Sequence, residues 1–319
     1  MKIKVKVSRC DPMGRGVCEP YLQAYDVKVW LRMTVLEVLT KIKDEQDGSL
    51  TFRRSCRSAI CGSCAMKING HPKLACKTRV IPEYERHGSF TIEPLDNFSV
   101  IKDLVVDFDV FWEKVAKIEP WLTPKETGKG WWIVKKEDMS RVEDAGNCIF
   151  CGCCNGACNS LEADPNFLGP VVLAKAWRFV GDKRDGNSIK RLTRLSEEHG
   201  IWICSRCIEC TQVCPKDVKP LTAIERLRAQ AIKAGITDNR GVRHVDAMVD
   251  SVRRTGRLDE FTMTFKTLGV MRSIGMLPLG IRMELHGKMP LPVLFKAIEG
   301  IEEVKRIYEE IERQVMGDG

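Results

Sequence analysis

The sequence predicts an α+β protein in three parts, a mixed N-terminal domain followed by two helical parts. Three observations lead to this prediction. An alternating strand pattern opens the chain, two similar cysteine runs interrupt a helical middle region, and the residues after about 225 carry helical apolar spacing without any cysteine. We therefore expect domains at residues 1–105, 106–225 and 226–319.

The first part begins with strand and helix signals. Lysine alternates with isoleucine or valine over residues 2–7, which is the period of a half-buried strand, and residues 21–30 offer a second strand. Thr34 and Glu37 form a capping-box pair ahead of an apolar run, which predicts a helix. After a loop that contains cysteines, short strands are expected at 66–70 and 88–94. This order predicts a small α+β domain of the β-grasp type.

The later parts are predicted to be helical. Pro120, Pro124 and residues 128–132 form a linker-like break before the two cysteine runs. Beyond the runs, helical apolar spacing recurs at 227–235, 245–254 and 301–315. The last of these carries a stripe that predicts a face packed on a core or on a partner, made of Ile301, Val304, Ile307, Ile311 and Val315.

Composition excludes several classes of protein. The chain has 319 residues, is 44% hydrophobic and contains 15 cysteines. This number of cysteines is too large for residues that only pack in a core, and the chain is too long for a small disulfide-stabilised domain. The start of the chain lacks the apolar core of a signal peptide, and no long apolar run follows. We expect a cytoplasmic chain without membrane spans. The net charge of +8 suits an acidic partner, a nucleic acid or an anionic lipid surface equally well.

The first group of cysteines has a specific spacing. Cys56-x4-Cys61-x2-Cys64, with Cys76 further on, is the plant-type arrangement for a 2Fe-2S cluster. The small residues between the cysteines allow backbone N–H groups to face the sulfurs. The sequence therefore predicts that these four cysteines hold a 2Fe-2S cluster.

Two further groups repeat one pattern. Cys148-x2-Cys151-x2-Cys154-x3-Cys158 and Cys204-x2-Cys207-x2-Cys210-x3-Cys214 are both bacterial ferredoxin runs, and a proline follows the second. In proteins with two such runs, the fourth cysteine of each run ligates the cluster of the other run. One 4Fe-4S cluster is therefore expected on Cys148, Cys151, Cys154 and Cys214. A third cluster is expected on Cys158, Cys204, Cys207 and Cys210.

Zinc is the alternative occupant of paired cysteines, since tetrahedral thiolate sites use similar spacings. Two interlocking runs beside a plant-type loop favour iron–sulfur clusters instead. Three cysteines remain outside these sets. Cys10 and Cys18 are expected to be ordinary thiols. Cys153 is next to an expected ligand in the sequence but has no position of its own in the ligand pattern.

The order of these motifs resembles the iron–sulfur subunit of succinate dehydrogenase and fumarate reductase. The chain carries the 2Fe-2S loop, then CIFCGCCNGAC, then CSRCIECTQVCPKDVKP, and the connectors VIKDLVVDFDVFWEKVAKIEPWL and GPVVLAKAWRFVGDKRD are also similar to those of the family. The resemblance covers about residues 1–225. It implies an electron path from FAD in a separate flavoprotein subunit through 2Fe-2S and 4Fe-4S to a third centre and the quinone pool, with no catalytic residue for the dicarboxylate in this chain.

The resemblance also implies where in the cell the protein lies, and this sequence departs from the family pattern in two respects. A membrane-anchor partner would hold the chain on the inner face of the cell membrane. Most of the family has a 3Fe-4S third centre because the position of Cys207 is not cysteine, so a 4Fe-4S cluster is favoured here. Quinone-reducing members usually carry tryptophan, histidine and proline where this chain has Ala163, Ser205 and Asn159, which puts the usual quinone pocket in doubt.

The tail widens the range of possible partners. Residues 239–292 resemble the electron-carrying subunit of heterodisulfide reductases, which implies the unusual branch whose membrane partner is related to heterodisulfide reductase. The alternative function is therefore electron transfer in a thiol-linked fumarate reductase or a heterodisulfide-reductase-like complex. A regulator or nucleic-acid-processing protein with structural clusters is a third hypothesis. The sequence shows no DNA-binding motif, so no nucleic-acid partner is expected.

Overall fold

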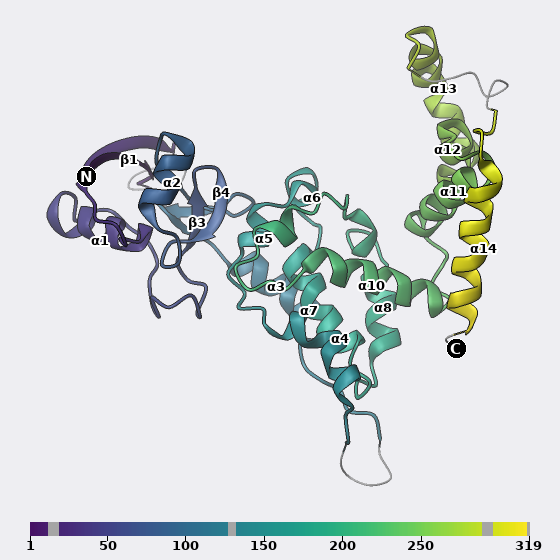
Figure 1. Cartoon of the computed structure of the whole chain (residues 1–319), viewed down its shortest axis with the longest axis horizontal. Helices are drawn as coiled ribbons and strands as arrows, with labels where there is room; N and C mark the ends of the chain where they lie inside the picture. The colour runs from purple at the N-terminus through teal and green to yellow at the C-terminus, as the bar shows by residue number, and fades with distance from the viewer. Residues whose placement is uncertain (12–18, 127–131, 289–295, 318–319) are drawn as a thin grey trace. The chain divides into compact units, whose positions relative to one another are not determined.

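A computed structural model of the chain describes residues 1–11, 19–126, 132–288 and 296–317. The chain folds into two compact units, Met1–Ala234 and Gly235–Gly319 (Figure 1). Each unit has its own set of packed elements. All of the predicted cluster-binding cysteines belong to the first unit.

Five strands form the N-terminal sheet in the order β2-β1-β5-β3-β4. β1 pairs antiparallel with β2 along its whole length and parallel with β5, while β3 lies antiparallel between β4 and β5. The strands that follow the cysteine loop therefore belong to the same sheet as the strands that precede it. The strand bounds are β1 (Lys2–Arg9), β2 (Tyr21–Lys28), β3 (Ala65–Ile68), β4 (His71–Leu74) and β5 (Thr91–Glu93).

Helix α1 (Val35–Glu45) packs on this sheet, as the sequence predicts. The Thr34 side chain accepts a hydrogen bond from the Glu37 N–H, and the Glu37 carboxylate accepts from the Thr34 N–H at 2.7 Å, so the capping box is complete. The alternation along β1 buries Ile3, Val5 and Val7 and leaves the lysines exposed. These patterns are local, and for that reason the sequence predicts them well.

The sheet domain also contains parts that the sequence does not predict. Strand β4, helix α2 (Val80–His87) and the ribbon of β6 (Val100–Lys102) and β7 (Val105–Val106) are all additional. The buried Arg9 binds this ribbon to the first strands, because its guanidinium forms ion pairs with Asp103 at 3.0 Å and with Asp47. Tertiary contacts rather than local propensity therefore stabilise the short elements.

The rest of the first unit is helical. Helix α7 is its buried centre, and α4 and α10 pack on it. The predicted boundary at residue 225 falls inside helix α10, and the compact unit ends at Ala234. The bounds are α3 (Asp109–Lys117), α4 (Lys136–Gly146), α5 (Cys153–Gly156), α6 (Asn159–Ala163), α7 (Pro170–Val180), α8 (Ser188–Leu195), a 3-10 turn (Ile201–Ile203), α9 (Glu209–Gln212) and α10 (Pro220–Lys233).

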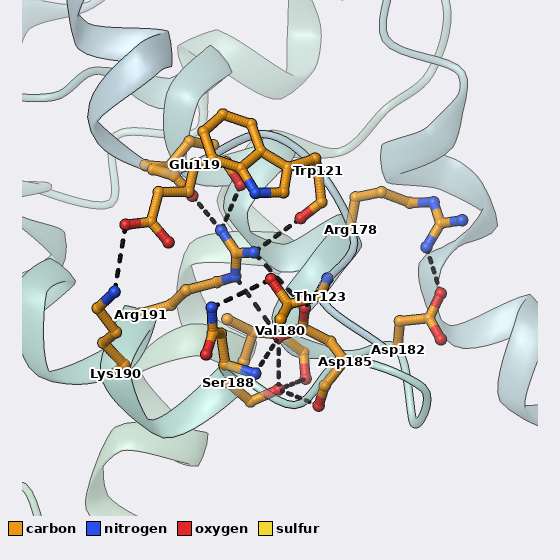
Figure 2. Close-up of polar contacts among 12 residues, drawn as sticks. Glu119, Trp121, Thr123, Arg178, Val180, Asp182, Asp185, Ser188, Lys190 and Arg191 are labelled. Carbon is orange, nitrogen blue, oxygen red and sulfur yellow. Dashed lines mark hydrogen bonds and ion pairs between the residues drawn. The ribbon is translucent and has the colours of Figure 1, made fainter. Parts of the chain in front are cut away.

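The buried Arg191 holds the segment after α3 against this helical region through hydrogen bonds (Figure 2). Arg191 on α8 donates to the backbone carbonyls of Ile118, Glu119 and Trp121, the last at 2.7 Å. Its charge faces Asp185, which is fully buried, at 3.5 Å. The proline-containing stretch is thus held by specific hydrogen bonds up to its last described residues, although the predicted break at 128–132 lies largely outside the described residues.

The second unit consists of helices. Helix α11 packs against α12 and α14, and α13 contacts α12. Of the predicted stripe on α14, Ile307 and Ile311 are exposed, and the side chain of Val315 lies outside the described part. Along the described ranges, no helix combines the length and apolarity needed to cross a bilayer. The bounds are α11 (Arg240–Thr255), α12 (Glu260–Leu268), α13 (Val270–Leu285) and α14 (Ile301–Gly317).

Candidate metal centres

The first cysteine loop arranges backbone N–H groups around sulfur atoms. The Sγ of Cys56 accepts from the N–H groups of Ser58, Ile60 and Cys61 at 3.3 to 3.4 Å. The Ala59 N–H donates to the Sγ of Cys76 at 3.3 Å, across a separation of 17 residues. Such N–H groups stabilise negative charge on sulfur, and this is the environment that a thiolate-held cluster requires.

The four sulfurs of this loop range from buried to exposed. Cys64 is 3% exposed, and burial raises the pKa of its thiol to about 12. Cys61 is exposed, and the Ser63 hydroxyl at 3.0 Å is the main cause that lowers its pKa to about 6. The side of the loop with Cys64 therefore packs on the sheet core, while the side with Cys61 is exposed.

The two later cysteine runs have the same backbone shape. Phe150 and Gly152 of the first run have φ of 54° and 82°, and Arg206 and Ile208 at the same positions of the second run have φ of 60° and 67°. A short helix, α5 or α9, follows in each run. Left-handed conformations are costly for a β-branched residue such as Ile208. Because these left-handed conformations recur at the same positions, we infer that both runs enclose the same kind of bound group.

Four cysteines of the expected 4Fe-4S set line one cavity in the first unit. Cys148, Cys151 and Cys154 of the first run share it with Cys214 of the second run, and the other lining side chains are mostly apolar. The Sγ of Cys214 accepts from the Val218 N–H at 3.3 Å. Burial raises the pKa of Cys148 to about 11 and holds the pKa of Cys154 well above its usual range. At Cys148 and Cys154 burial therefore disfavours a free thiolate, and a bound iron centre would offset this cost.

A second cavity brings together the remaining cysteines. Cys158 of the first run lines it with Cys204, Cys207 and Cys210 of the second run. Ser205 also lines this cavity, and its N–H donates to the Ser160 hydroxyl at 3.3 Å. Cys207, an expected ligand of the third centre, thus stands at the same cavity as the other three.

Each of the two cavities is lined by four cysteines. Within the described ranges, no three Cys, His, Asp or Glu side chains converge on one point as the ligands of a single metal ion do. A cluster of several irons and sulfides needs thiolates that are spread around a cavity with apolar walls and N–H donors. The first cavity has mostly apolar walls and the Val218 N–H at the Cys214 sulfur, and the first loop supplies N–H donors to Cys56 and Cys76.

The first cysteine loop packs against the residues of the first cavity. Gly62 of the first loop lies against Cys151, so close that an added Cβ would stand 2.8 Å from the Cβ of Cys151. The Lys77 ammonium, beside Cys76, donates to the Pro215 carbonyl at 3.2 Å. The first loop is therefore packed directly against the residues of the first cavity.

A half-buried lysine and a buried arginine lie beside the runs. The Lys175 ammonium stands 5.1 Å from the centre of the Phe150 ring, and burial lowers its pKa although the Cys148 sulfur opposes this effect. The Arg228 guanidinium donates to the carbonyls of Ile201 and Cys204 at 2.9 and 2.8 Å. Each positive charge is positioned to offset the negative charge that thiolates bring to its cavity.

Sequence reasoning missed several supporting residues. Asn155 is buried; its side chain accepts from the Val171 N–H at 3.3 Å, and its carbonyl accepts from Asn97 at 2.8 Å. Asn97 also donates to the Cys158 carbonyl at 3.1 Å. The position of Asn155 between two cysteines was the only signal that could have identified it. Its partners at 97 and 171 could not be read from spacing.

The cysteines outside the three sets have different environments. Cys153 is fully buried within the core of the sheet domain and lines neither cavity. Cys10 is disulfide-bonded, so the expectation of an ordinary thiol is wrong for this residue. Cys18 lies outside the described residues.

The fold and the three cysteine sets define an electron-transfer iron–sulfur protein. Residues 4–113 match the family described as "2Fe-2S iron-sulfur cluster binding domain", and residues 144–218 match "4Fe-4S dicluster domain". These matches confirm the predicted α+β class and the order of the two cluster-binding domains.

Curated relatives identify the family more closely. The chain is 37% identical to the "8-methylmenaquinol:fumarate reductase iron-sulfur subunit" of Wolinella succinogenes over 82% of this chain and 83% of that protein. It is 40% identical to the "Fumarate reductase iron-sulfur subunit" of Mycobacterium tuberculosis over 72% and 93%. It is 39% identical to the mitochondrial "Succinate dehydrogenase [ubiquinone] iron-sulfur subunit 1" of Oryza sativa over 72% and 82%.

The chain belongs to the family of iron–sulfur subunits of succinate dehydrogenases and fumarate reductases. It is therefore the electron-transfer subunit of an oxidoreductase complex, as the motifs predict. A solved structure agrees, since a chain of the "Mycobacterium smegmatis Sdh1 complex in the apo form" matches with a TM-score of 0.66 and 28% identity over 73% of this chain and 96% of that chain. These names favour the leading interpretation over the thiol-linked, heterodisulfide-reductase-like and regulatory alternatives.

Proposed function

We propose that the chain passes single electrons between FAD in a flavoprotein subunit and a membrane acceptor, the quinone pool, through three iron–sulfur centres. Cys56, Cys61, Cys64 and Cys76 would hold the 2Fe-2S cluster. The first cavity, with Cys214, would hold a 4Fe-4S cluster, and the second cavity, with Cys158, would hold the third centre. Bound clusters supply the one-electron chemistry, and the protein supplies placement, burial and charge.

One observation carries the proposal. Eight cysteines line two cavities in sets of four within one compact unit, and Gly62 of the first cysteine loop lies against Cys151 of the first cavity. A protein that used clusters only for structure would not need the sets to adjoin. Direct contact between them supports a path for electrons.

We propose a 4Fe-4S rather than a 3Fe-4S cluster as the third centre. Cys207 lines the second cavity beside Cys158, Cys204 and Cys210, which supports this assignment. A fourth thiol at the cavity gives the fourth iron a ligand.

The partners and location follow from the family. We propose that the β-grasp domain at 1–105 meets the flavoprotein subunit near the exposed Cys61, and that the all-helical domain at 106–225 leads to the acceptor. A membrane-anchor or heterodisulfide-reductase-like subunit would hold the complex at the inner, cytoplasmic face of the membrane, with the extension at 226–319 as a contact. The dicarboxylate site would lie in the flavoprotein.

The test is low-temperature EPR on the anaerobically purified complex, with and without succinate, together with mass identification of the chains that copurify. Growth of the 2Fe-2S signal on succinate and a copurifying flavoprotein are the expected results. Fumarate should reverse the signal, which controls for nonspecific reduction. Clusters that respond to neither compound would show that the chain serves another flavoprotein.

A further inference from the structure

A partly exposed histidine–carboxylate pair joins two segments that carry expected ligands of the third centre. The Nδ1 atom of His199 stands 2.6 Å from the Oδ2 atom of Asp164, and the two side chains are 41% and 24% exposed. Asp164 follows helix α6, whose N-cap is Cys158, and His199 precedes the 3-10 turn that leads to Cys204. The pair therefore connects the segment of Cys158 with the segment of Cys204.

Backbone hydrogen bonds fix the pair beside the wall of the second cavity. The Leu168 N–H donates to the His199 carbonyl at 3.0 Å, and the Phe167 N–H donates to the Asp164 carbonyl at 3.0 Å. Ser160 and Phe167, which precede and follow Asp164 in the sequence, both line the cavity. The position of the pair relative to the cavity is thus set by the main chain.

A buried lysine lies between the pair and the cavity. The Lys114 ammonium of α3 donates to the carbonyls of Pro165 and Phe167 at 2.5 and 2.8 Å. Burial lowers the pKa of Lys114, and the charges of Asp164 and Cys158 oppose this effect. The same cation is therefore within electrostatic reach of the carboxylate of the pair and of a sulfur of the cavity.

The hydrogen bond determines which nitrogen of His199 is free to bind a proton. The hydrogen bond from His199 is the main cause that lowers the pKa of Asp164, so this carboxyl is charged near neutral pH and accepts from the Nδ1–H group. The basic nitrogen is then Nε2. Histidine is the side chain that ordinarily changes its charge between about pH 5 and pH 8, and the exposed imidazole can exchange this proton with water.

The remaining charged side chains near the pair along the chain are exposed: Glu162 on α6, Glu197 and Glu198 before His199, and Lys117 on α3. Charges at the surface are screened by water and salt, whereas buried charges are screened much less. Asp164, the buried Lys114 and the charge in the second cavity are therefore the groups that govern the proton on His199.

We propose that His199 takes up a proton when the third centre accepts an electron, and releases it when that centre is oxidised. One electron reaches the third centre from the second centre, and one proton passes from water to the Nε2 atom, so the local net charge stays the same. The added negative charge and the Asp164 carboxylate both favour the imidazolium form. This inference rests on the proposed third centre and adds a proton-exchange site at that end of the electron path.

The test is EPR-monitored redox titration of the third centre in the anaerobically purified complex, at several pH values between about 6 and about 8. Because the reduced centre favours protonated His199, its midpoint potential should become more negative as pH rises. We expect the equilibrium constant for reduction to fall by about threefold or more across this range. A unit charge about 10 to 15 Å away, at an effective dielectric constant of about 20 and with partial screening, has an effect of this size.

The first variant is His199→Gln, which should abolish the pH dependence, because the amide can still donate to Asp164 but does not titrate. The matched control is His87→Gln. His87 also lies beside a carboxylate, with its Nε2 atom 3.7 Å from the Oε2 atom of Glu83, but it belongs to helix α2 of the sheet domain.

A second variant, Asp164→Asn, removes the charge that favours the imidazolium and leaves His199 in place. The pH dependence of the third centre should then move to lower pH. The direction of this change tests the pair even if His199→Gln lowers the yield of folded complex.

Each outcome decides the inference. A potential that depends on pH in the native complex and in His87→Gln, but not in His199→Gln, supports it. A third centre whose potential does not depend on pH overturns it and leaves the electron-transfer proposal standing, and so does a dependence that survives in His199→Gln or is lost equally in both histidine variants. A complex that shows no signal of a third centre overturns both proposals.

Discussion

Gly62 lies directly against Cys151, and this contact joins the first cysteine loop to the first cavity. A Cβ on Gly62 would stand 2.8 Å from the Cβ and 2.9 Å from the Cα of Cys151, and its backbone has a φ of 74°. Real Cβ atoms do not approach so closely, so only glycine allows this packing. Electron transfer between neighbouring centres depends on their separation, and Gly62 keeps the two loops in contact.

Gly62→Ala should separate the two loops. We expect slower electron transfer from the 2Fe-2S centre to the next centre, measured by rapid-freeze EPR after reduction, and a lower free energy of unfolding. The control is Gly70→Ala, because Gly70 has a similar φ of 78° and nothing within 4 Å of an added Cβ. Both variants carry the left-handed penalty of about 1 kcal/mol. Equal effects in both would show that the contact with Cys151 has no role.

Cys207→Ser should convert the third centre to a 3Fe-4S type. The substitution removes one of the four thiols at the second cavity and leaves Cys158, Cys204 and Cys210 in place. An oxidised 3Fe-4S EPR signal is the expected result. Cys153→Ser is the matched control for the third centre, since Cys153 is buried but lines neither cavity, and the signal of the third centre should be that of the native chain. An unchanged 4Fe-4S signal in Cys207→Ser would show that Cys207 is not a ligand.

Lys175→Gln should lower the midpoint potential of the second centre. The Lys175 ammonium is near Cys148, and a positive charge favours the added electron. EPR-monitored redox titration should show a shift to more negative potential at this centre and smaller shifts at the other two. Lys175→Arg should restore the potential. The exposed Lys183, which pairs with Asp138 at 2.8 Å, offers a control in Lys183→Gln. Identical shifts for both glutamine variants would contradict the assignment to Lys175.

The stability of the helical domain should fall in acid through Asp182. Although burial opposes it, hydrogen bonds from Arg184 and Arg178 hold the pKa of the Asp182 carboxyl well below its usual range. Figure 2 shows the contact with Arg178. A carboxyl with a lowered folded pKa stabilises the fold above its unfolded pKa of about 3.9, and this stabilisation is lost as pH falls through the folded value.

The measurement is urea unfolding of the native chain and of Asp182→Asn between neutral and acidic pH. We expect the native chain to be more stable at neutral pH, and the difference between the two to shrink as pH falls below about 4. Comparison with the variant removes the effect of acid on the clusters, which both chains share. A difference that does not depend on pH would show that the Asp182 charge contributes nothing.

Local patterns predicted much of the fold. The alternation in β1, the capping box of α1 and the periodicity of α10, α11 and α14 are set by neighbours in sequence, and the structure contains them. Sequence patterns did not predict β4, α2 or the β6–β7 ribbon. These elements are short and depend on contacts such as that between Arg9 and Asp103, which are 94 residues apart. Such contacts leave no periodic signal.

By itself, the sequence determined the family, the two types of cysteine motif and the proposed ligand sets, because ligand spacing is a property of the local chain. Only the tertiary structure decided that Gly62 adjoins Cys151 and that Lys175 lies near Cys148. Close packing and burial join residues that are far apart in the chain, and no spacing in one sequence specifies which of them meet.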